Sequence, residues 1–104
     1  MKINSRFPVS YIEISREAYR HNLAFIRSLI GNRTIFSSVI KANAYGHNIS
    51  AFVPMAYEEG VRYFSVFNTE EAWECFRAIQ SLTGRKRPPV HIMIMGQCEG
   101  DGLD

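Results

Sequence analysis

The sequence predicts an α/β fold built on a parallel sheet, and two observations carry this prediction. Strand-like and helix-like segments alternate along the chain, and the strand-like segments at residues 35–41, 62–67 and 90–95 are nearly continuous in apolar residues. Continuous apolar strands are typical of parallel sheets that are covered on both faces. Strands separated by helices of this length form right-handed βαβ units.

The first predicted elements are a short strand and a helix. Residues 9–15 alternate and are rich in β-branched and aromatic side chains, which favours a strand. Ser15 then offers an N-cap for a helix that runs through Ile30, and Gly31 follows in the position where a left-handed residue commonly ends a helix. The helix carries one apolar stripe, formed by Tyr19, Leu23, Ile26 and Ile30.

The next pair of elements is a strand at residues 34–42 and a helix at residues 48–59, which Gly60 ends. Pro54 lies inside this helix and has no backbone N–H. We therefore expect either a late start of the helix, near Ser50, or a kink.

A third strand is predicted at residues 61–67, and a second capped helix follows it. Asn68 with Glu71 three residues later resembles a capping box. Residues 87–96 close the series with another apolar strand, and Pro88 and Pro89 lie at its start. The helix between these strands buries one face, formed by Ala72, Cys75, Phe76 and Ile79.

Composition indicates an ordinary globular domain. The chain has 104 residues, of which 46% are hydrophobic and 21% charged, with a formal charge of +2. Its densest basic run, residues 84–89, has no interleaved aromatic residues and indicates a solvated turn, so we expect no nucleic-acid partner. Cys75 and Cys98 form no CxxC pair and suggest no disulfide framework; Cys75 lies on the apolar helix face.

Localisation follows from what the sequence lacks. No apolar stretch approaches the roughly 18 residues of a membrane span, and the N-terminus has no signal-peptide core. We therefore expect a cytoplasmic protein without a membrane partner. The histidines at positions 21, 47 and 91 share no ligand spacing, so no metal site is predicted.

Lys41 is the first candidate for chemistry. It ends an apolar strand, and the carboxyl ends of parallel strands border the crevice in which α/β folds bind ligands. Low-dielectric surroundings there favour the neutral amine, which is the nucleophilic form. Gly46 allows close approach of the backbone to a ligand, and the Tyr45 hydroxyl can donate to a phosphate oxygen. The alternative is a lysine on a solvated surface.

The segment VIKANAYGH, residues 39–47, closely resembles the cofactor-lysine segment of the alanine racemases. Residues 11–27 are similar to the opening strand and helix of that family, and residues 58–76 to its second barrel strand and following helix. Residues 91–96 match its third strand. The resemblance implies the first three strands of a (β/α)8 TIM-type barrel, a fold that needs about 250 residues when complete. Residues 1–104 are thus expected to be the N-terminal part of a larger protein.

Site residues follow from the same resemblance. Lys41 matches the lysine that binds pyridoxal 5'-phosphate and later serves as one of two catalytic bases, and Tyr45 matches the tyrosine that contacts the cofactor phosphate. Asn43, Gly46 and His47 are interpreted as loop-shaping, with His47 a hydrogen-bonded structural histidine. Family members usually carry Gly where Asn48 stands. Asn tolerates a left-handed conformation and can cap the next helix, so this departure is mild.

The implied activity is the interconversion of L- and D-alanine for peptidoglycan precursors, by a homodimer. The second catalytic base and most of the phosphate-binding groups of the family have no counterpart in these 104 residues. We therefore expect the isolated chain to be inactive.

Three alternatives stay open. One is a barrel-type racemase for serine or a basic amino acid, and another is an amino-acid decarboxylase of the same fold. The third is a non-catalytic remnant.

The remaining acidic and aromatic residues of interest are predicted to be structural. We expect Glu70, Glu71 and Glu74 to lie on a solvated helix face, and Trp73 and Phe76 to pack between helix and sheet.

Overall fold

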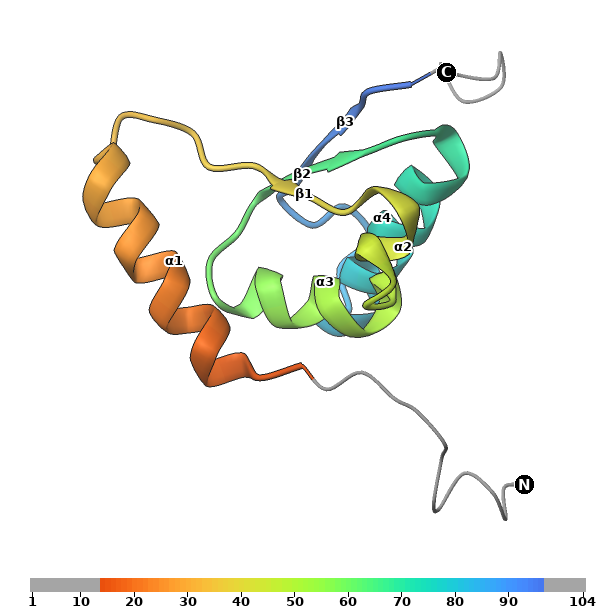
Figure 1. Cartoon of the computed structure of the whole chain (residues 1–104). Helices are drawn as coiled ribbons and strands as arrows, with labels where there is room; N and C mark the ends of the chain where they lie inside the picture. The colour runs from red at the N-terminus through yellow and green to blue at the C-terminus, as the bar shows by residue number, and fades with distance from the viewer. Residues whose placement is uncertain (1–13, 97–104) are drawn as a thin grey trace, which may run out of the picture.

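The computed structural model describes residues 14–96 and places helices against one face of a three-stranded sheet (Figure 1). The strand predicted at residues 9–15 lies outside the described residues except for its last two, which form no strand. The elements are α1 (Arg16–Ile30), β1 (Ser38–Val39), α2 (Lys41–Tyr45), α3 (Ile49–Glu58), β2 (Tyr63–Val66), α4 (Thr69–Thr83) and β3 (His91–Ile94).

The sheet has the order β1-β2-β3, and both pairs of strands are parallel. Ser38 lies opposite Phe64, which lies opposite Ile92. The predicted α/β fold class is therefore confirmed, and the alternation of strands and helices is consistent with the first three strands of a (β/α)8 barrel.

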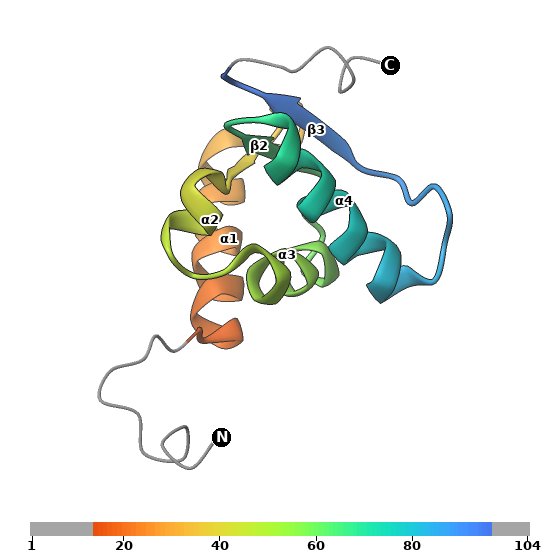
Figure 2. The same ribbon diagram turned by 90° about the vertical axis from the view of Figure 1, so that its right-hand side faces the viewer.

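The core lies between the sheet and the helices α3 and α4, which both views place on the same side of the sheet (Figures 1 and 2). Alternate residues of the strands face this side, and Ile40, Phe64 and Val66 are fully buried there. Burial of Cys75 on α4 raises the pKa of its thiol to about 12, which confirms its prediction as a core residue. The helices contribute Ile49, Val53, Ala56, Cys75 and Ile79.

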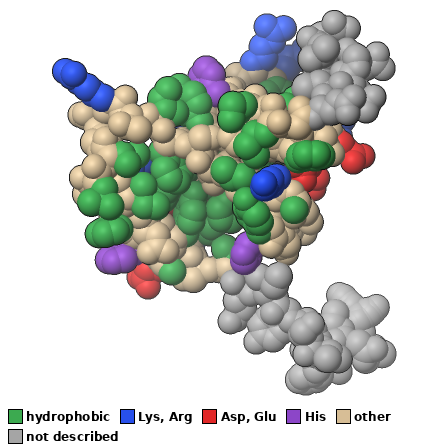
Figure 3. Space-filling model, turned by 45° about the horizontal axis from the view of Figure 1, so that its top comes forward, with side chains coloured by type: hydrophobic (Ala, Val, Ile, Leu, Met, Phe, Trp, Pro, Cys, Tyr) green, Lys and Arg blue, Asp and Glu red, His purple; other side chains and the backbone are tan. Residues whose placement is uncertain are grey.

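The opposite face of the sheet is open among the described residues, which corrects one prediction. Burial alternates along β3, where His91 and Met93 are exposed while Ile92 and Ile94 are half-buried. Figure 3 brings the top of the Figure 1 view forward and shows hydrophobic side chains gathered there. The strands were predicted to be covered on both faces; no described element covers this one. Its exposed apolar residues are Val39, Phe67, Met93 and Met95.

Helix α1 is capped as predicted, but its apolar stripe is not all that attaches it to the rest of the fold. The Ser15 hydroxyl accepts a hydrogen bond from the Ala18 N–H. Of the predicted stripe, Leu23 is buried, whereas Ile26 is 37% exposed. Gly31 has φ 78° and ψ 179°, so the helix ends in a positive-φ residue as predicted, although its ψ lies outside the left-handed helical range. The stripe alone therefore does not hold α1.

Charged groups attach α1 to the carboxyl end of α3. Arg16 and Arg20 both bind the carboxylate of Glu59, whose side chain is only 9% exposed. Arg20 and then Arg16 lower the pKa of Glu59 to about 2 by hydrogen bonding to its charged form. Tyr19 adds an edge-on aromatic contact to Phe52, with ring centres 5.1 Å apart.

The other two long helices begin as their caps predict. The Asn68 side chain accepts from the Glu71 N–H at 2.9 Å, and α4 starts at the next residue. Asn48 has φ 77° and accepts from the Ser50 N–H at 2.9 Å, which confirms both roles expected of this residue. Helix α3 begins at Ile49, and Pro54 lies inside it.

The strand predicted at residues 34–42 is much shorter in the structure. Strand β1 covers two residues, and the chain then enters α2, a turn of left-handed helix. Ala42, Asn43 and Ala44 have φ of 55–59° and ψ of 44–48°, and Tyr45 also has φ 55°. Each left-handed non-glycine residue costs about 1–2 kcal/mol, so α2 is a strained segment.

The Glu59 cluster predicts an acid-sensitive stability. Because the pKa of Glu59 is lower in the folded chain than in the unfolded one, its carboxylate stabilises the fold above the unfolded pKa. That contribution disappears as the pH falls from about 4.5 towards about 2. We expect Glu59→Gln to lower the urea midpoint at pH 7 and to match the wild type near pH 2. Glu58→Gln is the control, since Glu58 is 44% exposed and has one arginine contact; equal losses in both variants would refute the prediction.

The left-handed turn predicts that a glycine will stabilise the chain. Ala42 is exposed and has φ 55°, so Ala42→Gly removes a steric strain and no buried contact. We expect the free energy of unfolding in urea to rise by about 1 kcal/mol. Ala24→Gly, at an exposed position inside the right-handed helix α1, should instead lower it by about 1 kcal/mol. A loss of stability in Ala42→Gly would mean that the turn is not left-handed.

Candidate functional site

The candidate site lies where the chain leaves β1 at the carboxyl edge of the sheet (Figure 1). Lys41 is the first residue of α2 and is exposed. Tyr45 is the last residue of α2 and is 59% exposed. A single strained turn therefore carries the primary amine at one end and the phenol at the other.

The residues on either side of the turn are buried. Ile40 and Ile49 are both fully inaccessible to solvent and belong to the core. Ala44, in the middle of the turn, is 4% exposed and packs in the same core. Three buried residues thus anchor the turn in the core, while the side chains of Lys41 and Tyr45 remain exposed to solvent.

Hydrogen bonds close the turn from within. The Ala44 N–H donates to the Ile40 carbonyl at 2.8 Å, and the Gly46 N–H donates to the Ala42 carbonyl at 3.1 Å. The Asn43 side-chain oxygen accepts from the Ile49 N–H at 2.9 Å and so links the turn to the start of α3. The loop-shaping role predicted for Asn43 is thereby confirmed.

Glu71 fastens the turn to α4 from outside. One carboxylate oxygen accepts from the Asn43 N–H at 3.1 Å, and the other accepts from the Phe67 N–H at 2.9 Å. Glu71 was predicted to lie on a solvated face, and this was wrong because both of its oxygens serve as acceptors for backbone groups. The capping-box pattern pointed to Glu71, but not to its contact with a residue 28 positions away.

Of the two remaining loop residues, Gly46 has the role expected of it and His47 does not. Gly46 has φ 89° and ψ −3°, a left-handed conformation that glycine adopts without strain. His47 is exposed, and its N–H donates to the Ala44 carbonyl at 3.0 Å. Within residues 14–96 its side chain makes no hydrogen bond, so the prediction of a hydrogen-bonded structural histidine is not met.

The donor set of the turn fits pyridoxal phosphate in its chemistry. An amine suits the aldehyde of that cofactor, and a phenol hydroxyl suits its phosphate. The low-dielectric surroundings expected around Lys41 are not formed by the described residues, because the side chain is exposed. The turn therefore presents two of the groups that such a site needs, and further walls must come from elsewhere.

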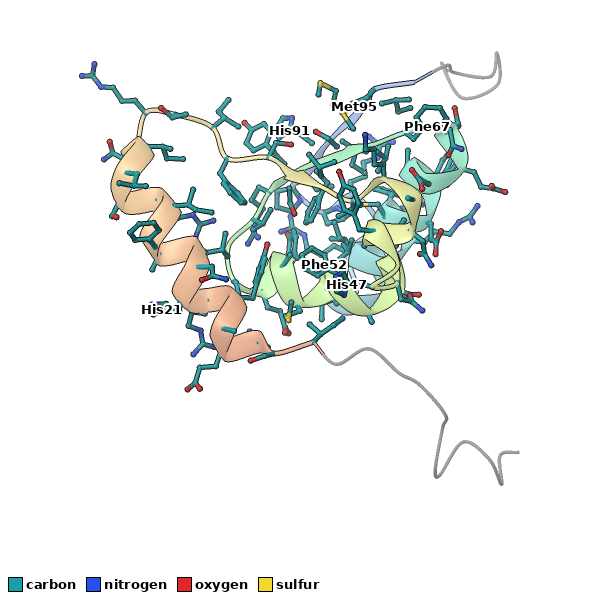
Figure 4. All side chains as sticks on the ribbon, viewed as in Figure 1. His21, His47, Phe52, Phe67, His91 and Met95 are labelled. Carbon is teal, nitrogen blue, oxygen red and sulfur yellow. The ribbon has the colours of Figure 1, made fainter. Side chains whose placement is uncertain are left out.

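Neither a cluster of metal ligands nor a membrane-spanning helix is found in the part of the chain that the structure describes. His21 lies on α1, His47 in the turn between α2 and α3, and His91 on β3 (Figure 4). No three potential ligand residues gather among the described residues. None of the described helices has the length and apolar character needed to cross a bilayer.

Comparison with known proteins matches residues 14–96 to the family described as alanine racemase, N-terminal domain. A lysine racemase of Proteus mirabilis is 38% identical over 65 residues, which cover 62% of this chain and 16% of that protein. An alanine racemase of Desulforamulus reducens is 35% identical over 93 residues, 89% of this chain and 23% of that protein. An alanine racemase of Chlorobaculum tepidum is 44% identical over 69 residues, 66% of this chain and 18% of that protein. No solved structure matches.

The matched segment contains every element of the described fold, including the turn that carries Lys41 and Tyr45. The chain spans only 16% to 23% of the length of these relatives. The family match covers most of the chain, and the resemblance first seen in residues 39–47 is thereby confirmed. This chain belongs to the alanine racemase N-terminal domain family.

Proposed function

We propose that this chain is the cofactor-lysine part of a pyridoxal-phosphate-dependent alanine racemase, an isomerase that interconverts L- and D-alanine. The observation that carries the proposal is the strained left-handed turn, which holds Lys41 and Tyr45 at the carboxyl edge of a parallel sheet. Strain of this kind concentrates at functional sites, and carboxyl edges are where α/β folds bind ligands.

Four residues in and around the turn have distinct roles in this proposal. The Lys41 amine binds the cofactor, and the same Nζ, when free, accepts a proton from or returns one to the substrate carbon. The Tyr45 hydroxyl donates to the cofactor phosphate. Asn43 and Glu71 hold the backbone between these two groups. When bound, the cofactor supplies an electron sink that makes the α-proton of an amino acid acidic.

The whole activity requires more than these residues. We propose that residues 1–104 form the N-terminal part of a longer, homodimeric and cytoplasmic protein that supplies D-alanine for peptidoglycan precursors. The chain accounts for less than a quarter of each of the three relatives named above, which supports this view. A second base for the opposite face of the substrate carbon and further cofactor contacts would come from the rest of that protein.

Lysine is the second candidate substrate. The similarity to a lysine racemase of Proteus mirabilis, at 38% identity, favours it over other amino acids. The turn itself does not distinguish the two substrates, because both present the same α-amino group to the cofactor. Assay of the longer protein with L-alanine and L-lysine separates these possibilities.

Borohydride trapping tests the assignment of Lys41. The purified chain is incubated with pyridoxal phosphate, reduced and digested, and the phosphopyridoxyl mass is located by peptide mapping. We expect Lys41 to carry at least tenfold more label than Lys86, which is also exposed and serves as the internal control. The reason is that an ordered turn presents one amine next to a phosphate donor. Equal labelling of the two lysines would refute the assignment.

Removal of Glu71 tests the support of the turn. Glu71→Ala leaves two backbone N–H groups without their carboxylate, which costs about 0.5–1.5 kcal/mol for each exposed bond. We expect the preference of the label for Lys41 over Lys86 to fall severalfold, with circular dichroism unchanged.

Glu74→Ala is the matched control, since Glu74 is exposed on the same helix. We expect it to retain the full preference for Lys41, and Glu71→Gln, which keeps one acceptor oxygen, to restore part of it. A preference that survives in Glu71→Ala would show that the carboxylate does not position the turn.

A further inference from the structure

A cavity lies at the opposite edge of the sheet from Lys41. It has a volume of about 440 Å³ and opens between the end of α1, the segment before β1 and the start of β2. Small-molecule sites commonly have about 300–1,000 Å³. Its lining residues are Arg27, Ile30, Gly31, Asn32, Thr34, Ile35, Phe36, Gly60, Arg62 and Tyr63.

Arg27 is one of two arginines that line this cavity. It is half-buried, and its Nη1 donates to the backbone carbonyl of Glu59 at 3.3 Å. Its guanidinium carbon lies 5.9 Å from the ring centre of Phe36. At Gly60 a Cβ would lie 3.5 Å from Nη1, so the guanidinium rests close to the backbone there. These contacts fix the group, and its other N–H donors have no hydrogen-bond partner among residues 14–96.

Arg62 is the second guanidinium and is held in the same manner. Its Nη1 donates to the carbonyls of Tyr57 at 2.7 Å and of Val61 at 3.1 Å. Its guanidinium carbon lies 3.7 Å from the centre of the Tyr57 ring. Backbone carbonyls and an aromatic ring orient the group without neutralising its charge.

The charge in the cavity is not compensated by the described residues. No carboxylate within residues 14–96 pairs with Arg27 or Arg62. The segments 24–37 and 60–69 contain no Asp or Glu, and the carboxylate of Glu59 is bound by other arginines. Two half-buried, oriented and unpaired guanidiniums create a positive potential inside a concave site.

We propose that this cavity is a binding site for a small carboxylate with an apolar body. The guanidinium groups of Arg27 and Arg62 bind the carboxylate, for which their planar N–H donors are suited. Ile30, Ile35 and Phe36 provide apolar wall for the remainder of the ligand. The site is separate from Lys41 and does not depend on the proposed racemase function.

Titration of the chain with benzoate tests the proposal. Amide resonances are followed by heteronuclear NMR, with benzamide as the neutral isostere and inorganic phosphate as an anion without an apolar body. We expect saturable benzoate shifts centred on Gly31, Asn32 and Gly60, and at least tenfold weaker binding of benzamide and phosphate. Absence of saturable binding, or equal binding of benzamide, overturns the proposal. Phosphate that binds as tightly as benzoate overturns the assigned ligand class.

Arginine variants locate the site. Arg27→Gln and Arg62→Gln are each expected to weaken benzoate binding at least tenfold. Arg33→Gln removes the same charge at an exposed position between two lining residues and should change the affinity less than twofold. Equal losses of benzoate affinity in all three variants would mean that only the net charge of the chain matters, and would overturn the proposed site. The comparison of benzoate with benzamide on the wild-type chain keeps the test decisive if Arg62→Gln does not fold.

Discussion

The left-handed turn of α2 is the constraint that the rest of the structure has to satisfy. Four consecutive residues, Ala42 to Tyr45, have positive φ, and none of them is glycine. Such a segment persists only where its surroundings leave it no alternative. Here the buried residues Ile40 and Ile49 fix its ends, Ala44 fixes its middle, and Glu71 binds its backbone from a different helix. Stability from the core is thus used to hold a polar segment in a conformation it would not adopt alone.

The packed face of the sheet and its carboxyl edge have different roles. One face of the strands packs against α3 and α4, and their carboxyl edge leads into the turn. Because Ile40, Phe64 and Val66 are fully buried against the helices, the ends of β1 and β2 have little freedom, and neither have the groups attached to them. Glu71 extends this order by joining the backbone after β2 to the backbone after β1. Two neighbouring strand ends are therefore tied to each other at the edge that carries Lys41.

Arginines divide into two groups with different surroundings. Arg16 and Arg20 meet the carboxylate of Glu59 and attach α1 to the body of the fold. Arg27 and Arg62 are held by carbonyls and aromatic rings, so their orientation is set while their charge remains available. A guanidinium has enough N–H donors to satisfy backbone carbonyls and still bind an anion. This difference in partners separates the structural role of one pair from the binding role that we propose for the other.

The sequence by itself determined the order of the three strands and of the helices α1, α3 and α4, the caps at Ser15, Asn48 and Asn68, and the identity of Lys41 and Tyr45 as site residues to be tested. These are local properties, because caps depend on residues two or three positions apart and the racemase-like segment is nine residues long. Only the tertiary structure decided that β1 ends early, that its continuation is left-handed, and that Glu71 supports it. Ala and Tyr have no intrinsic preference for positive φ, so this conformation comes from contacts between residues far apart in the chain. No pattern within a single segment encodes it.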